Sequence, residues 1–513
     1  MSDQLQLDGR SLTLDDVERV AFTGKGGLEI TLAPDARTRV AASRAIVDEA
    51  IASGRVIYGI TTGFGALADV VIPADRVRDL QINLLRSHAA GVGTELPIAD
   101  VRAITLLRAN VLAAGYSGVR VELVERLIDL LNVGVHAVIP GRGSVGASGD
   151  LAPLSHLALV LVGEGEAWFD GERLPGGEAL HRAGLAALTL EAKEGLALVN
   201  GTQVHTGIGT LTLLAAERAL DTAEVAGEMS LEALRGTPDA FDDAIQRVRP
   251  QPGQVTSARL LRAVLADSEI RESHRHGDPR VQDAYSIRCM PQVHGAARQG
   301  LAYVKAVLET EINSVTDNPL IFADEGRILS GGNFHGQPVA QALDLAAIAC
   351  ADLASMSERR IARLVDPALS GLPAFLTEDP GVNSGLMMAQ IVAAALVAEI
   401  KLKAIPASTD SIPTDANRED HVSMGVGAAL KFRDAVDILE TVLALELITA
   451  AQGLEFLRPL KPGIGVDQAR HRLRERVPRL GRDRELGPDI HAAEMLVREG
   501  AFADICRALG DVS

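Results

Sequence analysis

Hydrophobic positions along the chain recur at the spacing of helices, and helix start and stop signals separate the stretches. Thr13 followed by Asp16 predicts the cap of a short first helix. Pro34 predicts the start of a helix that ends near Gly54. Three further helix starts are expected, at Pro73, Pro97 and Val119. Two local strand signals accompany these helices: a strand over 28–32 and a hairpin over 168–174, which turns at Asp170-Gly171.

From residue 200 onward, long stretches rich in Ala and Leu are apolar on most faces, which is typical of helices buried in a bundle. These stretches cover about residues 200–235, 294–315, 337–364, 385–404 and 420–452. A charged stretch over 463–486 precedes a last helix predicted near 488–508. The pattern predicts a mainly α fold, with a smaller mixed N-terminal lobe over 1–199 and a central and C-terminal helical bundle over 200–513.

Composition narrows the class of protein. Phe, Trp and Tyr make up only 3% of the 513 residues, so the core must consist of aliphatic side chains, which favours tightly packed helices. The net charge of −18 argues against a nucleic-acid or anionic-membrane partner. The chain starts with a polar segment and has no apolar run of the roughly 18 to 20 residues that would span a bilayer. Three widely spaced cysteines, Cys289, Cys350 and Cys506, form neither a disulfide framework nor a metal cluster, and we expect a cytoplasmic protein without a metal site.

A glycine-rich block over 141–149 is the first candidate for chemistry. Residues 141–146 fit the dinucleotide-binding pattern G-x-G-x-x-G. However, Pro140 interrupts the junction between strand and loop, and no alternation of strands and helices surrounds it. A nucleophile elbow around Ser148 also fails, because Asp150 stands where the second glycine belongs.

A third interpretation fits the block better. In a tight bend, the backbone nitrogen of Gly149 can attack the carbonyl carbon of Ala147, because glycines allow unusual backbone angles. Loss of water from that adduct and from the Ser148 side chain would leave a five-membered ring with an exocyclic alkene, which is an electrophile. The tripeptide alone is weak support, because Ala-Ser-Gly is common in ordinary turns.

The wider sequence around this tripeptide resembles the aromatic amino acid ammonia-lyases. Residues 143–156, GSVGASGDLAPLSH, are similar to the signature of that family, and residues 58–65, YGITTGFG, resemble its catalytic tyrosine loop. Further matches follow in the same order along the chain: KEGLALVNGTQ at 193–203, QDAYSIRC at 282–289, DNP at 317–319 and SGGNFH at 330–335.

The resemblance implies a cofactor and an architecture. Ala147, Ser148 and Gly149 would form the methylidene-imidazolone (MIO) ring autocatalytically. The N-terminal lobe would carry this ring, and the bundle would consist of long antiparallel helices. The family forms homotetramers, in which each active site combines residues from three subunits.

The resemblance also implies roles for individual residues. Tyr58 would take the β-proton of the substrate, for which its phenol must ionise well below the ordinary pKa of about 10. Tyr285 would assist and orient the ring. The other expected site residues are Asn200 and Phe334 beside the ring, Gln282 in the substrate site, and Arg288, whose planar fork suits a carboxylate.

Two stretches favour the histidine branch of this family. Residues 87–93, SHAAGVG, and 419–425, EDHVSMG, resemble that branch, and they place His88 and Glu419 where the substrate side chain binds. An imidazole offers a donor and an acceptor, which these two residues can satisfy. The implied reaction converts L-histidine to trans-urocanate and ammonia. Two alternatives stay open: a tyrosine or phenylalanine ammonia-lyase or aminomutase, and a non-catalytic helical scaffold.

Some positions depart from the family pattern. Ala284 replaces a usual Pro, Arg418 a common Gln and Asp415 a Ser. Arg418 precedes Glu419 directly, where it can neutralise the carboxylate. Simpler interpretations also exist for single residues: Arg288 can pair with Asp283, His88 can cap a helix, and Glu419 can be a helix N-terminal charge.

Overall fold

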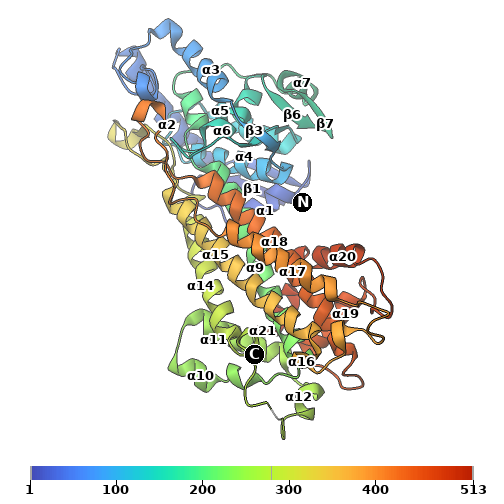
Figure 1. The fold of residues 1–513 in the computed structure, drawn as a ribbon. Helices are drawn as coiled ribbons and strands as arrows, with labels where there is room; N and C mark the ends of the chain where they lie inside the picture. The colour runs from blue at the N-terminus through green and yellow to red at the C-terminus, as the bar shows by residue number, and fades with distance from the viewer. Residues whose placement is uncertain (1–2, 279, 511–513) are drawn as a thin grey trace. The chain divides into compact units, whose positions relative to one another are not determined.

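The computed structural model describes residues 3–278 and 280–510 and consists mostly of helices (Figure 1). Contacts within the chain divide it into two compact units. Unit 1 comprises Met1–Leu211, Lys305–Asp344 and Pro406–Leu430, and unit 2 comprises Thr212–Val304, Leu345–Ile405 and Lys431–Ser513.

Unit 1 combines helices with small sheets. Its helices are α1 (Leu14–Phe22), α2 (Pro34–Ala52), α3 (Val77–His88), α4 (Ile98–Ala113), α5 (Val121–Val133), α6 (Leu151–Leu161), α7 (Gly176–Arg182) and α8 (Glu194–Val199). Its strands are β1 (Asp3–Leu7), β2 (Leu28–Leu32), β3 (Val92–Glu95), β4 (His136–Ala137), β5 (Pro140–Arg142), β6 (Glu166–Phe169), β7 (Glu172–Pro175), β8 (Leu320–Phe322) and β9 (Arg327–Leu329). The β1–β2 pair is parallel, and the pairs β3–β5, β4–β6, β6–β7 and β8–β9 are antiparallel.

The local signals of unit 1 are confirmed. The Thr13 hydroxyl oxygen accepts a hydrogen bond from the Asp16 backbone nitrogen, and the Asp16 carboxylate accepts one from the Thr13 backbone nitrogen. Together these bonds form a complete capping box at the start of α1. The β6–β7 hairpin turns through Asp170 and Gly171, both of which have positive φ. Helix α4 is buried from Asp100 to Ala113 and contacts α1, α2 and α5, so it forms the centre of this unit.

Four long helices contribute residues to both units. Helices α9 (Gln203–Ala233), α15 (Gln337–Val365) and α18 (Gly425–Glu455) begin in unit 1 and end in unit 2, whereas α14 (Met290–Glu311) runs the opposite way. The antiparallel arrangement of the long helices is therefore confirmed. The remaining helices of unit 2 are α10 (Asp243–Val248), α11 (Pro252–Leu265), α12 (Glu269–Ser273), α13 (Tyr285–Arg288), α16 (Pro367–Ser370), α17 (Met387–Lys403), α19 (Ile464–Arg474), α20 (Gly487–Arg498) and α21 (Ala503–Gly510).

Buried polar pairs join the long helices inside unit 2. Arg360 of α15 pairs with Glu446 of α18 at 2.5 Å, and both side chains are fully buried. Ser230 of α9 donates to the same carboxylate at 2.6 Å. Glu224 of α9 bonds Nδ1 of His294 in α14 at 2.8 Å. Because each of these buried charges has a partner, the bundle tolerates these pairs in a core that is mostly aliphatic.

The structure differs from the sequence predictions at the C-terminal helix, the lobe boundaries and one apolar helix. The single helix expected near 488–508 is wrong: Gly500, at φ 78°, separates α20 from α21. The expected lobes, 1–199 and 200–513, do not follow the two units, because residues 305–344 and 406–430 return to unit 1. Finally, α15 is long and apolar enough to cross a membrane by length and composition, but 61% of its apolar window is buried inside the chain, as in the core helix of a soluble protein.

Candidate active site

The loop that carries Tyr58 follows α2 and is anchored by a buried side chain. Ile60 is fully buried in a cluster with Val47 of α2 and Val77 of α3. The Tyr58 side chain turns back over the loop, and its hydroxyl oxygen accepts a hydrogen bond from the backbone nitrogen of Gly65 at 3.4 Å. The loop therefore holds the phenol in a defined place.

The Ala147-Ser148-Gly149 segment lies in a tight bend. Ser148 has a φ of 52° and Gly149 a φ of 86°, so two successive residues adopt the left-handed region. Gly149 pairs with Gly201, and a Cβ added at Gly149 would lie 2.2 Å from the Gly201 oxygen. Only glycine fits this close approach of two backbones.

Asp150 holds the end of the bend to the first turn of α9. Its carboxylate accepts hydrogen bonds from the backbone nitrogens of Val204 and His205, both at 3.0 Å, and meets Nδ1 of His205 at 2.9 Å. Burial alone would lower the pKa of His205, but the charge and hydrogen bond of Asp150 outweigh it and raise that pKa. The pair is fully buried.

His88 lies at the C-terminal end of α3. Its Nδ1 lies 2.9 Å from the backbone oxygen of Leu84 and 3.0 Å from the Ser87 hydroxyl. Glu419 lies in the segment before α18, where its backbone pairs with Thr414. One carboxylate oxygen accepts from the Ser148 hydroxyl at 2.8 Å and the other from the Thr414 hydroxyl at 2.8 Å.

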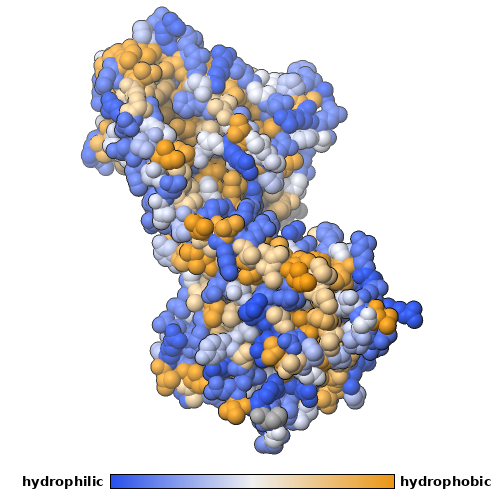
Figure 2. Space-filling view, viewed as in Figure 1, coloured by the Kyte–Doolittle hydropathy of each residue, from blue (hydrophilic) through white to orange (hydrophobic). Residues whose placement is uncertain are grey.

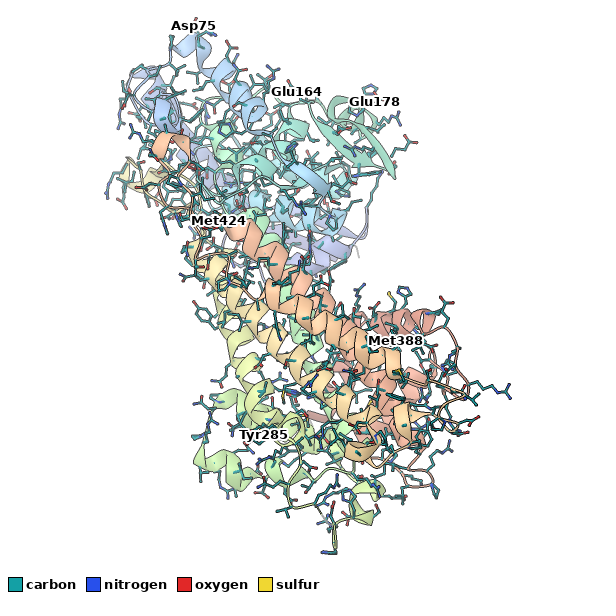
Figure 3. All side chains as sticks on the ribbon, viewed as in Figure 1. Asp75, Glu164, Glu178, Tyr285, Met388 and Met424 are labelled. Atoms are coloured by element: carbon teal, nitrogen blue, oxygen red, sulfur yellow. The ribbon has the colours of Figure 1, made fainter. Side chains whose placement is uncertain are left out.

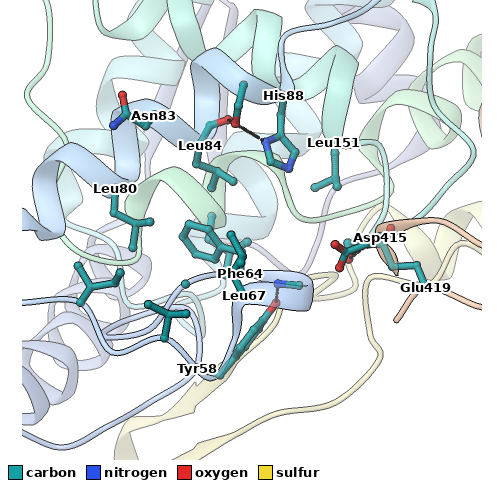
Figure 4. A pocket seen from close by; sticks show the side chains of 17 residues that line it. Tyr58, Phe64, Leu67, Leu80, Asn83, Leu84, His88, Leu151, Asp415 and Glu419 are labelled. Atoms are coloured by element: carbon teal, nitrogen blue, oxygen red, sulfur yellow. Dashed lines mark hydrogen bonds between the residues drawn. The ribbon is translucent and has the colours of Figure 1, made fainter. Parts of the chain in front are cut away.

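These elements meet around one cavity of about 540 Å³ (Figure 4). Four of the predicted site residues line it: Tyr58, His88, Ser148 and Glu419. Figure 4 shows Tyr58 and His88 on opposite sides and Glu419 with Asp415 on a third. The apolar part of the wall comes from Phe64, Leu67, Val70, Ile72, Leu80, Leu84, Leu151 and Leu196. The cavity has the size and the mixed wall of a small-molecule site.

The cavity is acidic, and this acts on Tyr58. Burial is the main cause that raises the pKa of the Tyr58 phenol; the Gly65 hydrogen bond opposes it, and the negative charges of Asp415 and Glu419 each add a smaller increase. Within this unit the pKa of Tyr58 is therefore raised, whereas the proton transfer expected of Tyr58 needs a lower one.

Asp415 is a site residue that the motifs did not assign. Its carboxylate lines the cavity and accepts from the backbone nitrogen of Ala66 at 2.9 Å. One sign of it was visible in the sequence, because Asp415 stands where the family pattern has a Ser. Arg418 does not pair with Glu419 but with Asp69, at 3.4 Å on the surface. The pair of Arg418 with Glu419 that sequence adjacency allows is thus not observed.

Asn200 is buried beside the bend rather than in the cavity wall. Its Nδ2 donates to Asp317 at 3.2 Å and to the backbone oxygen of Asn318 at 3.1 Å. Asp317 also forms a fully buried ion pair with Lys193 at 2.8 Å. The Oδ1 atom of Asn200 is buried without a partner, although the next residue, Gly201, pairs with Gly149. An unsatisfied acceptor at this place fits a further polar group, such as the ring expected from residues 147–149.

Phe334 lies in the segment before α15 and does not line the cavity. Its neighbour His335 stacks on the ring of His421 at 5.8 Å, and Nε2 of His335 lies 3.2 Å from the His421 backbone oxygen. Phe334 therefore belongs to a segment that contacts the Glu419 region.

Gln282, Tyr285 and Arg288 belong to unit 2, and all lining residues of the cavity belong to unit 1. Tyr285, labelled in Figure 3, is 69% exposed at the start of α13, and the Arg288 guanidinium lies over its ring at 4.5 Å. Asp283 pairs with Arg280 and the backbone of Thr237 rather than with Arg288. The alternative in which Arg288 pairs with Asp283 is therefore not observed.

The described part of the chain also shows the surroundings of the glycine-rich block, of the possible metal ligands and of the cysteines. Residues 141–146 begin inside β5, which is short and antiparallel to β3, so the parallel strands of a dinucleotide site are missing there. Residues 3–278 and 280–510 contain no group of three metal-ligating side chains. Cys289, Cys350 and Cys506 are free thiols.

Comparison with known proteins agrees with these motifs. A family model described as aromatic amino acid lyase matches residues 12–475. The histidine ammonia-lyases of Anaeromyxobacter dehalogenans (strain 2CP-C) and Myxococcus xanthus (strain DK1622) are 56% and 54% identical to this chain, over 97% and 98% of it and 99% of each relative.

Solved structures with the same fold include a histidine ammonia-lyase and an aminomutase. The histidine ammonia-lyase from Trypanosoma cruzi has a TM-score of 0.91 at 42% identity and covers 99% of this chain and 95% of its own. The tyrosine aminomutase from Streptomyces globisporus has a TM-score of 0.93 at 36% identity and covers 99% of both chains. The chain therefore belongs to the aromatic amino acid lyase family, whose members break a carbon–nitrogen bond.

Proposed function

We propose that this chain is a histidine ammonia-lyase, which removes ammonia from L-histidine to give trans-urocanate. The observation that carries the proposal is that His88 and Glu419 line the same cavity as Ser148. Both side chains offer hydrogen-bond partners that an imidazole can use and a phenyl ring cannot. The relatives named histidine ammonia-lyase support the same substrate.

The substrate ring would bind as an imidazolium. With Nδ1 of His88 bonded to the Leu84 oxygen, a neutral His88 ring presents its Nε2 as an acceptor, and Glu419 presents a second acceptor. An imidazolium ring carries an N–H group on each nitrogen and can therefore donate to both acceptors. The carboxylates of Asp415 and Glu419 favour that positive charge.

Ala147, Ser148 and Gly149 would close into the MIO ring. The left-handed bend and the unpartnered Oδ1 of Asn200 support a ring at this place. When present, the ring is an electrophile that makes the substrate amine a better leaving group. Residues of the chain would bind the substrate, orient it and move its β-proton.

Tyr58 would take the β-proton. The residues of its own unit raise its pKa, so the base form needs a positive charge nearby. A bound imidazolium supplies one, because an opposite charge favours the ionised phenol. Phe334 and Tyr285 would orient the ring, and Tyr285 would assist the proton transfer.

Gln282, Tyr285 and Arg288 would come from other copies in a homotetramer, where Arg288 binds the substrate carboxylate. Tyr285 and Gln282 are exposed, which leaves them free for such a role. Large apolar side chains are also exposed on α15 and α17, as Figure 2 shows over α17, and such patches are typical of subunit interfaces. They include Leu345, Ile348, Met388 and Ile391.

We also propose that the protein is cytoplasmic and has no nucleic-acid or membrane partner. Unpaired thiols at Cys289, Cys350 and Cys506 suit a reducing compartment. A net charge of −18 suits a small-molecule enzyme better than a binder of polyanions.

The substrate is tested with the purified protein and separate L-histidine, L-tyrosine and L-phenylalanine. We expect urocanate absorbance and ammonia from L-histidine in preference to the other two. A preference for tyrosine, or a β-amino acid product without net ammonia, would instead support the lyase or aminomutase alternatives.

The ring is tested by intact mass. The mature chain should be lighter than its sequence by two water molecules, and Ser148→Ala should keep the fold and lose turnover. An unshifted mass in the unsubstituted chain would support the non-catalytic scaffold.

A further inference from the structure

Glu419 holds the hydroxyl group that ring formation must remove. The Ser148 hydroxyl donates to Oε1 of Glu419 at 2.8 Å. The opposite oxygen, Oε2, accepts from the Thr414 hydroxyl at 2.8 Å, and the Thr414 backbone nitrogen donates to the Glu419 backbone oxygen at 2.9 Å. Both carboxylate oxygens of Glu419 are therefore fixed, one by the Ser148 hydroxyl and the other by the Thr414 hydroxyl.

The other acids near the bend are engaged elsewhere. Asp150 follows directly along the chain, but its carboxylate is buried and bonded to Val204 and His205. Asp415 bonds the backbone of Ala66. Among these acids, only Glu419 contacts the Ser148 oxygen.

We propose that the carboxyl group of Glu419 protonates the Ser148 hydroxyl as it leaves during ring formation. Glu419 thus acts in maturation of the cofactor before it acts in substrate binding. This inference rests on the ring that the proposed function assigns to residues 147–149.

The step balances without a further reactant. The Cα–H bond of Ser148 breaks, its proton passes to solvent water, and its electron pair forms the Cα=Cβ double bond. A proton from solvent first adds to Oε1 of Glu419, which reverses the hydrogen bond, so that the carboxyl group donates to Oγ. The Cβ–Oγ bond then breaks, and Oγ takes this proton and leaves as water. One proton has entered from solvent and one has returned to it, so the net loss is one water molecule.

The step also prepares the substrate site. Once Oγ has left, Oε1 of Glu419 has lost its partner, and it faces the cavity that His88 also lines. The acceptor that binds the substrate ring is therefore freed by the same reaction that completes the cofactor.

Maturation is followed by intact mass on the full chain during cell-free synthesis, with samples quenched over time. Glu419→Gln keeps the shape and a hydrogen-bond acceptor but cannot supply a carboxyl proton. We expect its loss of the second water to be roughly 10²-fold slower, the low end of general acid catalysis. Asp415→Asn, a carboxylate change in the same cavity without contact to Ser148, should mature at the rate of the unsubstituted chain.

A second variant guards against a folding defect. Thr414→Val keeps the Glu419 carboxyl group but frees its Oε2, and it should mature several-fold more slowly while circular dichroism shows the same helix content. Maturation of both Glu419→Gln and Thr414→Val at the unsubstituted rate would overturn the inference. Failure of the unsubstituted chain to lose any water would instead overturn the ring itself.

Discussion

Nδ1 of His88 lies 2.9 Å from the backbone oxygen of Leu84, one turn earlier in α3. A carbonyl oxygen only accepts, so Nδ1 carries a proton and, in the neutral ring, Nε2 is the acceptor. The Ser87 hydroxyl near the same nitrogen already has the Leu84 oxygen as a partner at 3.1 Å. The hydrogen bond to the helix backbone therefore fixes the tautomer of His88 and leaves Nε2 as the acceptor for a ligand.

Replacing this acceptor should change substrate preference. In His88→Phe, an imidazole substrate leaves a nitrogen unpaired, and we expect kcat/KM for L-histidine to fall at least about 10²-fold. The ratio of L-phenylalanine to L-histidine turnover should rise. Steady-state assays with both amino acids measure this change.

Ser87→Ala is the matched control. It removes the neighbouring hydroxyl but leaves the Leu84 oxygen to hold His88, so its effect should be far smaller. Equal losses in the two variants would contradict a specific role for Nε2 of His88.

Arg418 should have little influence on the substrate. Its pair with Asp69 is exposed, with side-chain exposures of 58% and 92%, and such pairs contribute about 0–1 kcal/mol. Arg418→Gln should therefore change KM for L-histidine by less than about fivefold. Asp69→Asn should behave alike, whereas a change above tenfold in Arg418→Gln alone would show that Arg418 does act on Glu419.

The secondary structure followed from the sequence wherever the signal was local. The capping box at Thr13 and the hairpin at Asp170 each depend on a few neighbouring residues. The break at Gly500 was missed because a single glycine inside an apolar pattern is compatible with either a continued helix or a left-handed stop. The assignment of 305–344 and 406–430 to unit 1 depends on long-range packing, which no local pattern encodes.

The candidate site shows the same limit. Motif resemblance predicted Ser148 and Glu419, which lie 271 residues apart and are in hydrogen-bond contact. It did not predict the direction of the Arg418 side chain or the acidity that Asp415 adds around Tyr58, because both depend on how the 415–419 segment meets the tyrosine loop.

The Asp150 anchor should be required for both stability and ring formation. Asp150→Asn loses the charge opposite His205 and replaces one acceptor oxygen with a donor that faces N–H groups. Breaking a buried pair in this way costs roughly 3–5 kcal/mol. We expect a clear fall in the midpoint of thermal denaturation and a mass that shows incomplete water loss.

Ser144→Ala provides the comparison for that variant. Ser144 reaches the same carboxylate through a longer bond of 3.4 Å and accepts from the Gly146 backbone nitrogen at 3.1 Å, so its removal should cost about 1–2 kcal/mol, less than the loss of the Asp150 charge. A mature, equally stable Asp150→Asn chain would show that the bend forms without this anchor.

Glu232 of α9 supplies a pH-dependent part of stability. Its carboxyl group is buried in unit 2 and accepts from the Ser268 hydroxyl and from the Gly463 backbone nitrogen at 2.9 Å. Burial raises its pKa from 4.5 to about 7, against the lowering effect of these two hydrogen bonds. The protonated carboxyl group is thus favoured in the folded chain.

Between pH 4.5 and about 7, the unfolded chain releases this proton while the folded chain keeps it, so the contribution of Glu232 to stability is lost as pH rises through this window. The loss is about 3 kcal/mol and does not grow further at higher pH. Glu232→Gln removes the titration. Urea unfolding at several pH values should show that the free energy of unfolding of the variant, relative to that of the unsubstituted chain, increases by this amount up to about pH 7. Ser268→Ala removes a bond that lowers this pKa, so it should extend the loss to higher pH. Parallel stability curves for the unsubstituted chain and Glu232→Gln would contradict the raised pKa.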